Sequence, residues 1–234
     1  MPTQSTAKKP LVIITGASSG IGRALSLVFS EVGCSLGLLS RNKSSMEDLK
    51  LSSALSISTD VTHLEEVKQS IARCEEEFGP VDCLINNAGF GKDGEFTSLP
   101  HEVNDRMVQT NVMGVINTIE AVLPSMQARK TGTIINISSL AANHPRPHLA
   151  TYAASKAAVK SLTESLRMAN AKHGIRFCNV APAKIQTPML IQSNLNDEEV
   201  ISAEALSKTI LWIYQQPQTI CIRDMVIAPT YYES

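Results

Sequence analysis

The sequence has almost no net charge and no apolar segment at its start. Among its 234 residues, 21 lysines and arginines balance 22 aspartates and glutamates, for a formal charge of −1. A chain so balanced has no overall attraction to nucleic acid or to an anionic membrane, so neither is expected as a partner. The first ten residues contain Lys8, Lys9 and several hydroxylated residues, and form neither a signal peptide nor a spanning helix. We expect residues 1–10 to be a short mobile arm on a soluble, cytoplasmic protein.

Cysteine and histidine patterns typical of metal sites are also absent. The five cysteines include no C-x-x-C pair and most lie within apolar runs, which predicts reduced core residues. They are Cys34, Cys74, Cys83, Cys178 and Cys221. The histidines show no ligand spacing, so no metal site is predicted. No repeat, low-complexity segment or long linker divides the chain, which predicts one domain over residues 11–234.

What the sequence does contain is a regular alternation of strand-like and helical segments. Strand-like runs occupy residues 11–15, 35–40, 54–58, 82–86, 132–137, 175–180 and 220–228. Helical patterns separate them, including the long stretch from Met107 to Ala128. The alternation predicts an α/β fold built on a parallel sheet. A ligand would lie beyond the carboxyl ends of the strands.

The first strand leads into a glycine-rich turn. Leu11 to Ile14 precede T-G-A-S-S-G-I-G, and an apolar stripe at intervals of three and four residues then predicts a helix. Gly16, Gly20 and Gly22 permit a tight turn and close approach of a ligand, and exposed amides at the helix start attract phosphate. The turn predicts a pyrophosphate site, although its spacing G-x-x-x-G-x-G departs from the commoner G-x-G-x-x-G.

A second candidate site contains Tyr152 and Lys156, in the run Y-A-A-S-K. Four residues apart on a predicted helix, both side chains project from one face. A nearby ammonium favours the phenolate and lowers the tyrosine pKa from its usual value of about 10. Ser139 ends a strand-like run, where its hydroxyl is placed to hydrogen-bond a substrate oxygen. Together the three indicate ketone reduction or alcohol oxidation, whereas a Y-x-x-x-K pair alone occurs by chance on many helices.

Several ordered motifs together resemble the short-chain dehydrogenase/reductase family. They are T-G-A-S-S-G-I-G (15–22), Asp60, N-N-A-G (86–89), Asn111, Ser139, Y-A-A-S-K (152–156) and P-A-K-I-Q-T-P-M (182–189). The resemblance runs from about Leu11 to Thr230. It implies a single doubly wound Rossmann domain. The seven-stranded parallel sheet would have the order 3-2-1-4-5-6-7, with helices on both faces.

The resemblance also implies a catalytic set of Asn111, Ser139, Tyr152 and Lys156. Tyr152 would be the acid-base residue, and Ser139 would orient and polarise the carbonyl. Lys156 would lower the tyrosine pKa and hold the nicotinamide ribose. Asn111 would kink its helix and hold, through its backbone, a water that links the lysine to solvent. Without the other motifs, Asn111 would be an ordinary polar residue.

Further positions match residues that contact the cofactor in the family. Asp60, with Val61 beside it, matches the adenine-contacting aspartate, while Asn86 is expected to brace the central strand. Ala183 stands where the family usually has glycine, and its extra bulk would shift the loop. The expected cofactor contacts are Gly16, Ser18, Ser19, Gly20, Ile21, Gly22, Ser40, Arg41, Asp60, Val61, Asn87, Ala88, Gly89, Tyr152, Lys156, Pro182, Ile185 and Thr187.

The end of the second strand, L-G-L-L-S-R-N, bears on the choice of cofactor. An acidic residue there would bind both ribose hydroxyls of NAD and repel a 2′-phosphate, but this chain has Ser40 followed by Arg41. A hydroxyl and a guanidinium fork suit a phosphate dianion, so NADP(H) is the predicted cofactor. Alternatively, Arg41 simply opens an exposed loop, since the glycine-rich turn lacks the extra basic residue of some NADP-using relatives.

The segment after Thr187 is short, which predicts a compact and open substrate pocket. Met189, Leu190 and Ile191 would cover a substrate or pack against a neighbouring subunit. The C-terminal run Q-Q-P-Q-T-I-C-I-R-D-M-V-I-A-P-T resembles 3-hydroxy acid dehydrogenases and bacterial sepiapterin-reductase-like enzymes. Small 3-oxo acids, diketones and pterin side chains are therefore the candidate substrates.

Two histidines lie in the loop that borders the substrate in the family. His144 and His148 either contact the substrate or have no chemical role. The predicted function is NADPH-dependent reduction of a small carbonyl compound by a homodimer or homotetramer, joined through helices at 103–129 and 151–172. The alternative is a cofactor-binding sensor or scaffold of the same fold, although such proteins usually lose the tyrosine or lysine that this chain keeps.

Overall fold

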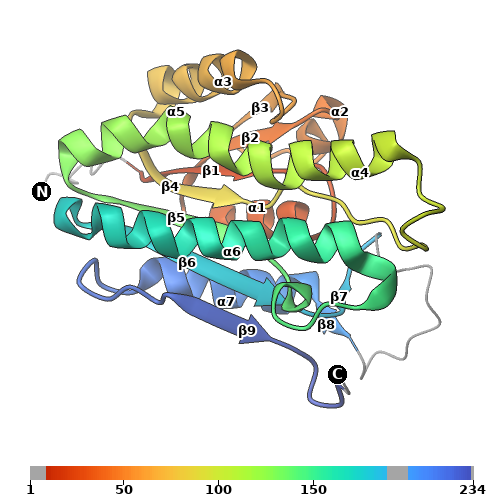
Figure 1. Ribbon diagram of the computed structural model, residues 1–234. Helices are drawn as coiled ribbons and strands as arrows, with labels where there is room; N and C mark the ends of the chain where they lie inside the picture. The colour runs from red at the N-terminus through yellow and green to blue at the C-terminus, as the bar shows by residue number, and fades with distance from the viewer. Residues whose placement is uncertain (1–8, 189–199, 233–234) are drawn as a thin grey trace, which may run out of the picture.

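The computed structural model describes residues 9–188 and 200–232, and its centre is a seven-stranded parallel sheet (Figure 1). The strands are β1 (Leu11–Thr15), β2 (Ser35–Ser40), β3 (Ala54–Ser58), β4 (Val81–Asn86), β5 (Gly132–Ile137), β6 (Ile175–Pro182) and β9 (Asp224–Ile227). Their order is β3-β2-β1-β4-β5-β6-β9, and every neighbouring pair is parallel. The predicted α/β fold and strand order are confirmed.

The last strand is shorter than its apolar run predicted. It begins at Asp224 rather than at residue 220. The preceding residues form a turn instead, in which the Ile220 amide donates to the Pro217 carbonyl at 2.8 Å. The Gln218 side chain holds this turn against the amino end of the sheet by donating to the carbonyls of Gly132 and Gly174. Side-chain bonding to the sheet therefore replaces strand pairing at this corner.

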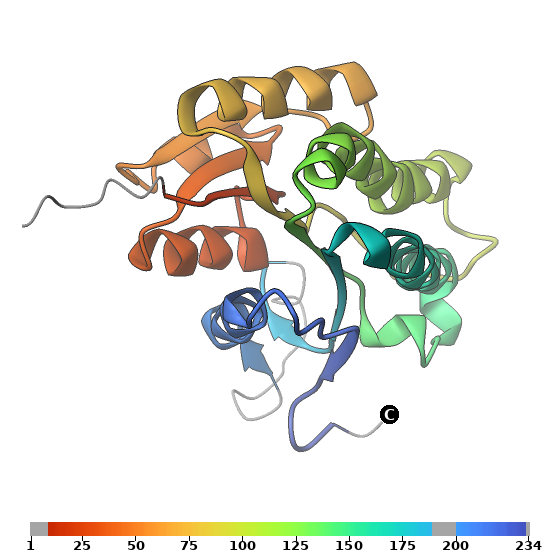
Figure 2. The same cartoon turned by 90° about the vertical axis from the view of Figure 1, so that its left-hand side faces the viewer.

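Helices cover both faces of the sheet (Figure 2). The helices α1 (Gly20–Glu31), α2 (Lys43–Glu47) and α7 (Ala203–Gln215) contribute to one apolar core, and α3 (Leu64–Phe78), α5 (Gly114–Arg129) and α6 (Ala150–Asn170) to the other. Alternate strand residues face opposite sides, so Val12 and Ile14 enter the first core, whereas Leu11 and Ile13 enter the second. A sheet buried on both faces explains the continuous apolar runs of its strands.

Buried polar side chains connect the two central strands to the helices above them. The Asn86 amide donates to Asn136 Oδ1 at 2.9 Å, and Asn136 in turn donates to the Thr163 hydroxyl at 2.8 Å. The Thr118 hydroxyl donates to Asn86 Oδ1 at 2.6 Å. All four residues are buried, so these bonds satisfy polar groups that water cannot reach. Asn86 therefore braces β4, as its position predicted.

A second, two-stranded sheet pairs β7 (Ile185–Gln186) with β8 (Ile201–Ser202). Met189, Leu190 and Ile191, the expected cover of the substrate pocket, lie outside the described residues, as does most of the expected N-terminal arm. Four of the five cysteines are buried, Cys221 is partly buried, and all five are free thiols. Among the described residues, no helix has the length and apolar character needed to cross a membrane.

Candidate functional site

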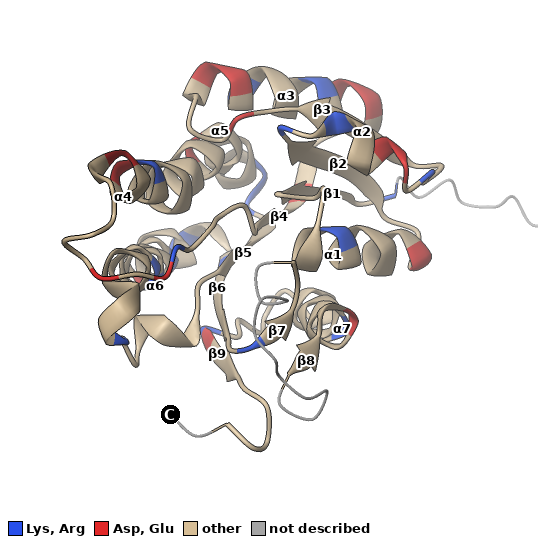
Figure 3. Cartoon of the chain, turned by 90° about the vertical axis from the view of Figure 1, so that its right-hand side faces the viewer, with Lys and Arg blue, Asp and Glu red and all other residues tan. Residues whose placement is uncertain are grey.

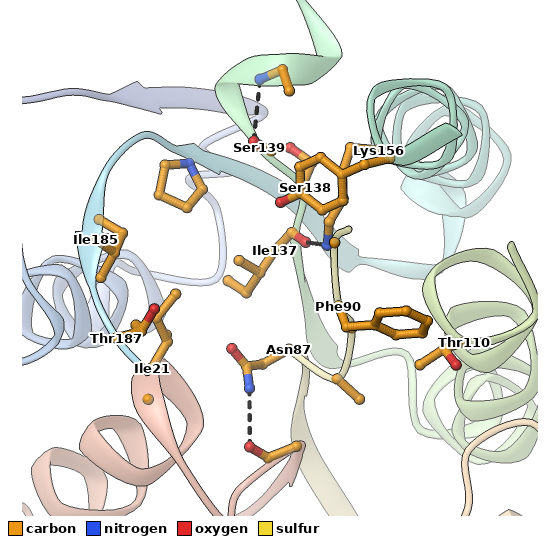
Figure 4. A pocket seen from close by; sticks show the side chains of 18 of the residues that line it. Ile21, Asn87, Phe90, Thr110, Ile137, Ser138, Ser139, Lys156, Ile185 and Thr187 are labelled. Atoms are coloured by element: carbon orange, nitrogen blue, oxygen red, sulfur yellow. Dashed lines mark hydrogen bonds between the residues drawn. The ribbon is translucent and has the colours of Figure 1, made fainter. Parts of the chain in front are cut away.

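A cleft of about 680 Å³ opens where the carboxyl ends of the parallel strands meet, as expected for this type of sheet. Figure 4 shows Ile21, Ile185 and Thr187 on one side and Phe90 and Thr110 on the other, with Ser139 and Lys156 at the top of the view. Of the residues predicted from sequence to form the site, all line this cleft except Gly22 and Asn111.

The glycine-rich turn follows β1 and forms one wall of the cleft. Gly16 and Gly20 adopt left-handed conformations, with φ of +66° and +52°, which residues with a Cβ rarely tolerate. A Cβ on Gly22 would lie 2.2 Å from the Gly16 carbonyl oxygen. Ser19, the N-cap of α1, makes no side-chain capping bond, so the first amides of the helix are left for a ligand. The turn thus fits a phosphate, with Gly22 shaping it from behind.

Thr15, at the end of β1, joins this turn to the end of β4. Its hydroxyl oxygen accepts hydrogen bonds from the amides of Asn87 at 3.1 Å and Ala88 at 3.0 Å. The Asn87 side chain donates back to the Thr15 carbonyl at 3.0 Å. Sequence reasoning missed Thr15; the only available signal was a hydroxylated residue closing a wholly apolar strand.

The far end of the cleft contains Ser40, Arg41 and Asp60. The Ser40 hydroxyl donates to Ser18 Oγ at 2.9 Å, which joins the end of β2 to the glycine-rich turn. Burial raises the pKa of Asp60, but hydrogen bonds from Thr62 and the charge of Arg41 outweigh it, and the net shift is downward. Asp60 is therefore a carboxylate near neutral pH, beside the exposed cationic Arg41.

Ser139, Tyr152 and Lys156 lie together at the opposite end. The Ser139 hydroxyl oxygen accepts a hydrogen bond from the Ala141 amide at 3.1 Å, and the Lys156 ammonium lies 5.8 Å from the centre of the Tyr152 ring. Lys156 Nζ donates to the Ile137 carbonyl at 2.9 Å. Burial raises the pKa of Tyr152 by more than the neighbouring Ser139 hydroxyl lowers it. Desolvation of the phenolate is thus the larger effect in this structure.

Asn111 is buried and does not itself line the cleft. A π-helical turn, Gln109–Met113, interrupts the long helix between α4 (His101–Val108) and α5, at the place where the resemblance implied a kink. The Asn111 side chain donates to the Phe90 carbonyl at 2.9 Å and accepts from the Phe90 amide at 3.0 Å. It also donates to the Ser155 hydroxyl at 3.0 Å. Asn111 therefore fixes the segment of cleft wall that includes Phe90.

The loop after β6 carries Pro182, Ile185 and Thr187 into the cleft. Ala183 has no positive φ, so its Cβ is accommodated where relatives usually have glycine. The left-handed residue is instead Lys184, with a φ of +46°. A Cβ on Gly20 would lie 3.2 Å from Thr187, which shows how closely this loop approaches the glycine-rich turn.

The two histidines of the loop before α6 have different environments. His144 lines the cleft, whereas His148 is not among its lining residues and lies 4.0 Å from Glu95. Sequence reasoning missed several other residues that line the cleft. They are Phe90, Arg106, Arg146, Lys184 and Tyr232.

Replacing Lys156 by Met is expected to change how stability depends on pH. Burial lowers the pKa of Lys156 from 10.5 to about 8, so between these values the unfolded chain binds a proton that the folded protein releases. The contribution of Lys156 to the free energy of unfolding is therefore lost as the pH falls from 10.5 to about 8. The variant lacks this contribution, so its free energy of unfolding relative to wild type should fall by about 2 to 3 kcal/mol between pH 7 and pH 10.

Urea unfolding of both proteins at several pH values measures this difference. The cysteines and the tyrosines distant from Lys156 titrate in both chains and cancel, as does any part of the lost Ile137 hydrogen bond that is independent of pH. A difference that stays constant from pH 7 to pH 10 would contradict the assignment of a buried, easily deprotonated lysine.

Comparisons with known proteins agree with this geometry. The sequence model of a family described as short chain dehydrogenase matches residues 10–198. An uncharacterized oxidoreductase of Listeria innocua is 35% identical, with 96% of this chain and 98% of that protein covered. A similar oxidoreductase of Listeria monocytogenes is 34% identical over 96% of this chain and 98% of its own length.

Solved structures are similar over nearly the whole chain. ElxO with NADP bound has a TM-score of 0.87 at 27% identity, covering 95% of this chain and 98% of that one. The 3-ketoacyl-(acyl-carrier-protein) reductase of Brucella melitensis, complexed with NADH, has a TM-score of 0.87 at 27% identity, covering 93% and 96%. The closed form of a serine dehydrogenase complexed with NADP⁺ has a TM-score of 0.91 over 96% of both chains, but at 24% identity it shows the fold alone.

Proposed function

Because this chain belongs to the short-chain dehydrogenase/reductase family, we propose that it is an NADPH-dependent reductase that converts a small carbonyl compound to an alcohol. The observation that carries the proposal is the grouping of Ser139, Tyr152 and Lys156 at one end of a cleft whose other end fits a dinucleotide. The candidate substrates are 3-oxo acids, diketones and pterin side chains. Residues 11–234 would form a single catalytic domain.

The residues at the catalytic end have separate roles in this proposal. Tyr152 donates its phenolic proton to the carbonyl oxygen, and its raised pKa keeps that proton in place at neutral pH. Ser139 hydrogen-bonds the same oxygen and stabilises the negative charge that develops there. Lys156, with a pKa of about 8, can lose or gain a proton near neutral pH and so can replace the one that Tyr152 gives up. A bound nicotinamide supplies the hydride.

The residues at the other end would hold the cofactor. The cradle formed by Gly16, Gly20 and Gly22 leaves no room for a Cβ at Gly22, and uncapped amides of α1 point to an anion there. Ser40 and Arg41 line the cleft and would recognise a 2′-phosphate, and the structural relative ElxO has NADP bound. The Brucella reductase is complexed with NADH, so the phosphate preference of this chain depends on its own Arg41.

We also propose that the protein works as a homodimer or homotetramer in the cytoplasm, where its five thiols would stay reduced. The helices α4 to α6 and the π-turn between them carry exposed apolar side chains that a second subunit would cover. Val108, Met113 and Met168 are 40%, 37% and 60% exposed.

Absorbance loss of NADPH or NADH, with 3-oxo esters, diketones, simple aldehydes and sepiapterin as acceptors, tests the proposal directly. Turnover with NADPH would support it. Binding of the reduced cofactor with no turnover of any acceptor would instead favour a sensor or scaffold of the same fold.

Arg41→Gln is expected to lower kcat/KM for NADPH by about tenfold to a hundredfold and to leave that for NADH nearly unchanged. A charged hydrogen bond contributes about 1.5–3 kcal/mol, and only NADPH carries the 2′-phosphate that would receive it. Steady-state kinetics with both cofactors measures the effect. Arg73→Gln, on the exposed surface of α3, removes the same charge away from the cleft and serves as the control. Wild-type preference for NADH would disprove the role of Arg41.

A further inference from the structure

Positively charged side chains gather at the catalytic end of the cleft. Arg106 of α4, Arg146 of the loop before α6 and Lys184 of the loop after β6 all line it, in addition to Lys156. Two acidic residues line the described part of the cleft. Asp93 lies at this end, whereas Asp60 lies at the far end with Arg41. Elsewhere, basic and acidic residues are interspersed over the outer helices (Figure 3). The excess of positive charge here is therefore local.

Tyr232, close to the C-terminus, connects two of these cations. The Arg146 guanidinium donates a hydrogen bond to the Tyr232 hydroxyl at 2.6 Å and lies 5.5 Å from the ring centre. The Lys184 ammonium lies 5.3 Å from the same ring centre. Both cations thus contact one aromatic ring, which holds them near each other despite their repulsion.

Arg146 and Lys184 keep most of their hydrogen-bonding capacity for a ligand. Within residues 9–188 and 200–232, no carboxylate is within 4.0 Å of Arg106, Arg146 or Lys184, although other cations of the chain have such partners. A guanidinium has five N–H donors and the Tyr232 hydroxyl accepts one hydrogen bond from it. Adjacent cations without a carboxylate favour an anion that binds both.

The backbone at Lys184 is left-handed, as it also is at Lys50 and Lys130 outside the cleft. Lys184 has a φ of +46°, a conformation that costs a non-glycine residue about 1–3 kcal/mol and that glycine adopts freely. The Ile201 amide donates to the Lys184 carbonyl at 2.9 Å, which holds the residue in this conformation. The lysine side chain is therefore present at a position where the backbone alone favours glycine.

We propose that the carbonyl substrate carries an anionic group, a carboxylate or a phosphate ester, which binds Arg146 and Lys184 beside Tyr232. The substrate carbonyl would then lie at Ser139 and Tyr152, which line the same end of the cleft. This inference rests on the proposed reductase function and names its substrate class. Arg146 and Lys184 are specificity-determining residues in this assignment, and Tyr232 positions them.

Matched pairs of anionic and neutral ketones test the assignment by binding, independently of turnover. The probes are 3-oxobutanoate with its methyl ester, and dihydroxyacetone phosphate with dihydroxyacetone, titrated calorimetrically into the protein saturated with NADP⁺. At least one anionic probe should bind about tenfold or more tightly than its neutral partner. The probe that does so distinguishes a carboxylate from a phosphate ester.

Variants assign that preference to particular residues. Arg146→Gln and Lys184→Gln should each weaken the preferred anion about tenfold and leave its neutral partner unchanged, while Arg146→Lys should keep part of the affinity. Lys172→Gln removes one charge from an exposed position outside the cleft and should change neither. The inference is overturned if neither anion binds better than its neutral partner. It is also overturned if the two variants weaken NADP⁺ instead of the anion.

The outcome separates this inference from the proposed function. Turnover of neutral diketones without any preference for anions would support the reductase function and contradict the anion site. Anion binding that depends on Arg146 and Lys184, with no NADPH oxidation by any acceptor, would support the anion site and contradict the reductase function.

Discussion

Replacing Tyr152 by Phe is expected to lower the rate of carbonyl reduction about a thousandfold while cofactor binding stays near the wild-type level. The substitution deletes one hydroxyl and keeps the ring, so the wall of the cleft retains its shape. It removes the proposed proton donor, and the Ser139 hydroxyl alone has no comparable acid-base capacity. NADPH oxidation under saturating acceptor measures the rate, and fluorescence of the bound reduced nicotinamide measures affinity.

Tyr214→Phe provides the matched control. Tyr214 is a partly buried tyrosine of α7 that packs against Phe29 and does not line the cleft, so loss of its hydroxyl should leave the rate unchanged. If Tyr152→Phe keeps the wild-type rate, Tyr152 is not the proton donor. If both variants lose activity equally, the effect is structural.

Gly22→Ala is expected to weaken binding of the dinucleotide about a hundredfold, equivalent to about 3 kcal/mol. The new Cβ would lie 2.2 Å from the Gly16 carbonyl oxygen and 2.7 Å from the Asn87 amide nitrogen, so the glycine-rich turn must move. Backbone displacement of this kind costs about 1–3 kcal/mol and shifts the amides that would bind phosphate. Titration with NADPH, together with the thermal melting temperature, measures both effects.

Gly33→Ala separates this clash from the general cost of replacing glycine. Gly33 has a φ of +84°, but nothing lies within 4 Å of the Cβ that alanine would add. Its replacement should lower stability by about 1 kcal/mol and leave NADPH affinity unchanged. Wild-type affinity in Gly22→Ala would mean that the turn can relax without affecting the cofactor site.

The sequence could predict the strands and most of the cleft because those features depend on local patterns, whereas the sheet order came from the family resemblance. The apolar strands, the left-handed Gly16 and Gly20, and the helical spacing of Tyr152 and Lys156 are each set within a few residues. Six strands were predicted to within two residues at each end, whereas β9 was predicted too long, because Gln218 bonds to distant carbonyls instead of continuing the strand.

The features that sequence reasoning missed depend on contacts between distant segments. Tyr232 reaches Arg146 across 86 positions of the chain, and no pattern near either residue indicates that they meet. The burial that raises the pKa of Tyr152 is also set by distant segments, because it depends on how deeply the whole fold encloses the phenol. The spacing of Tyr152 and Lys156 shows that they are neighbours, but it cannot show how much water surrounds them.

The hydrogen bonds at Thr15 and Asn111 hold the same segment of the cleft wall, residues 87–90, from behind. Thr15 binds the amides of Asn87 and Ala88, and two residues after Ala88 the backbone of Phe90 is held by Asn111. Asn111 also bonds Ser155, whose hydroxyl donates to the Tyr152 carbonyl at 2.7 Å. The turn that fits a phosphate and the helix that carries Tyr152 are therefore braced by the same short segment, residues 87–90, so one stretch of backbone supports both ends of the cleft.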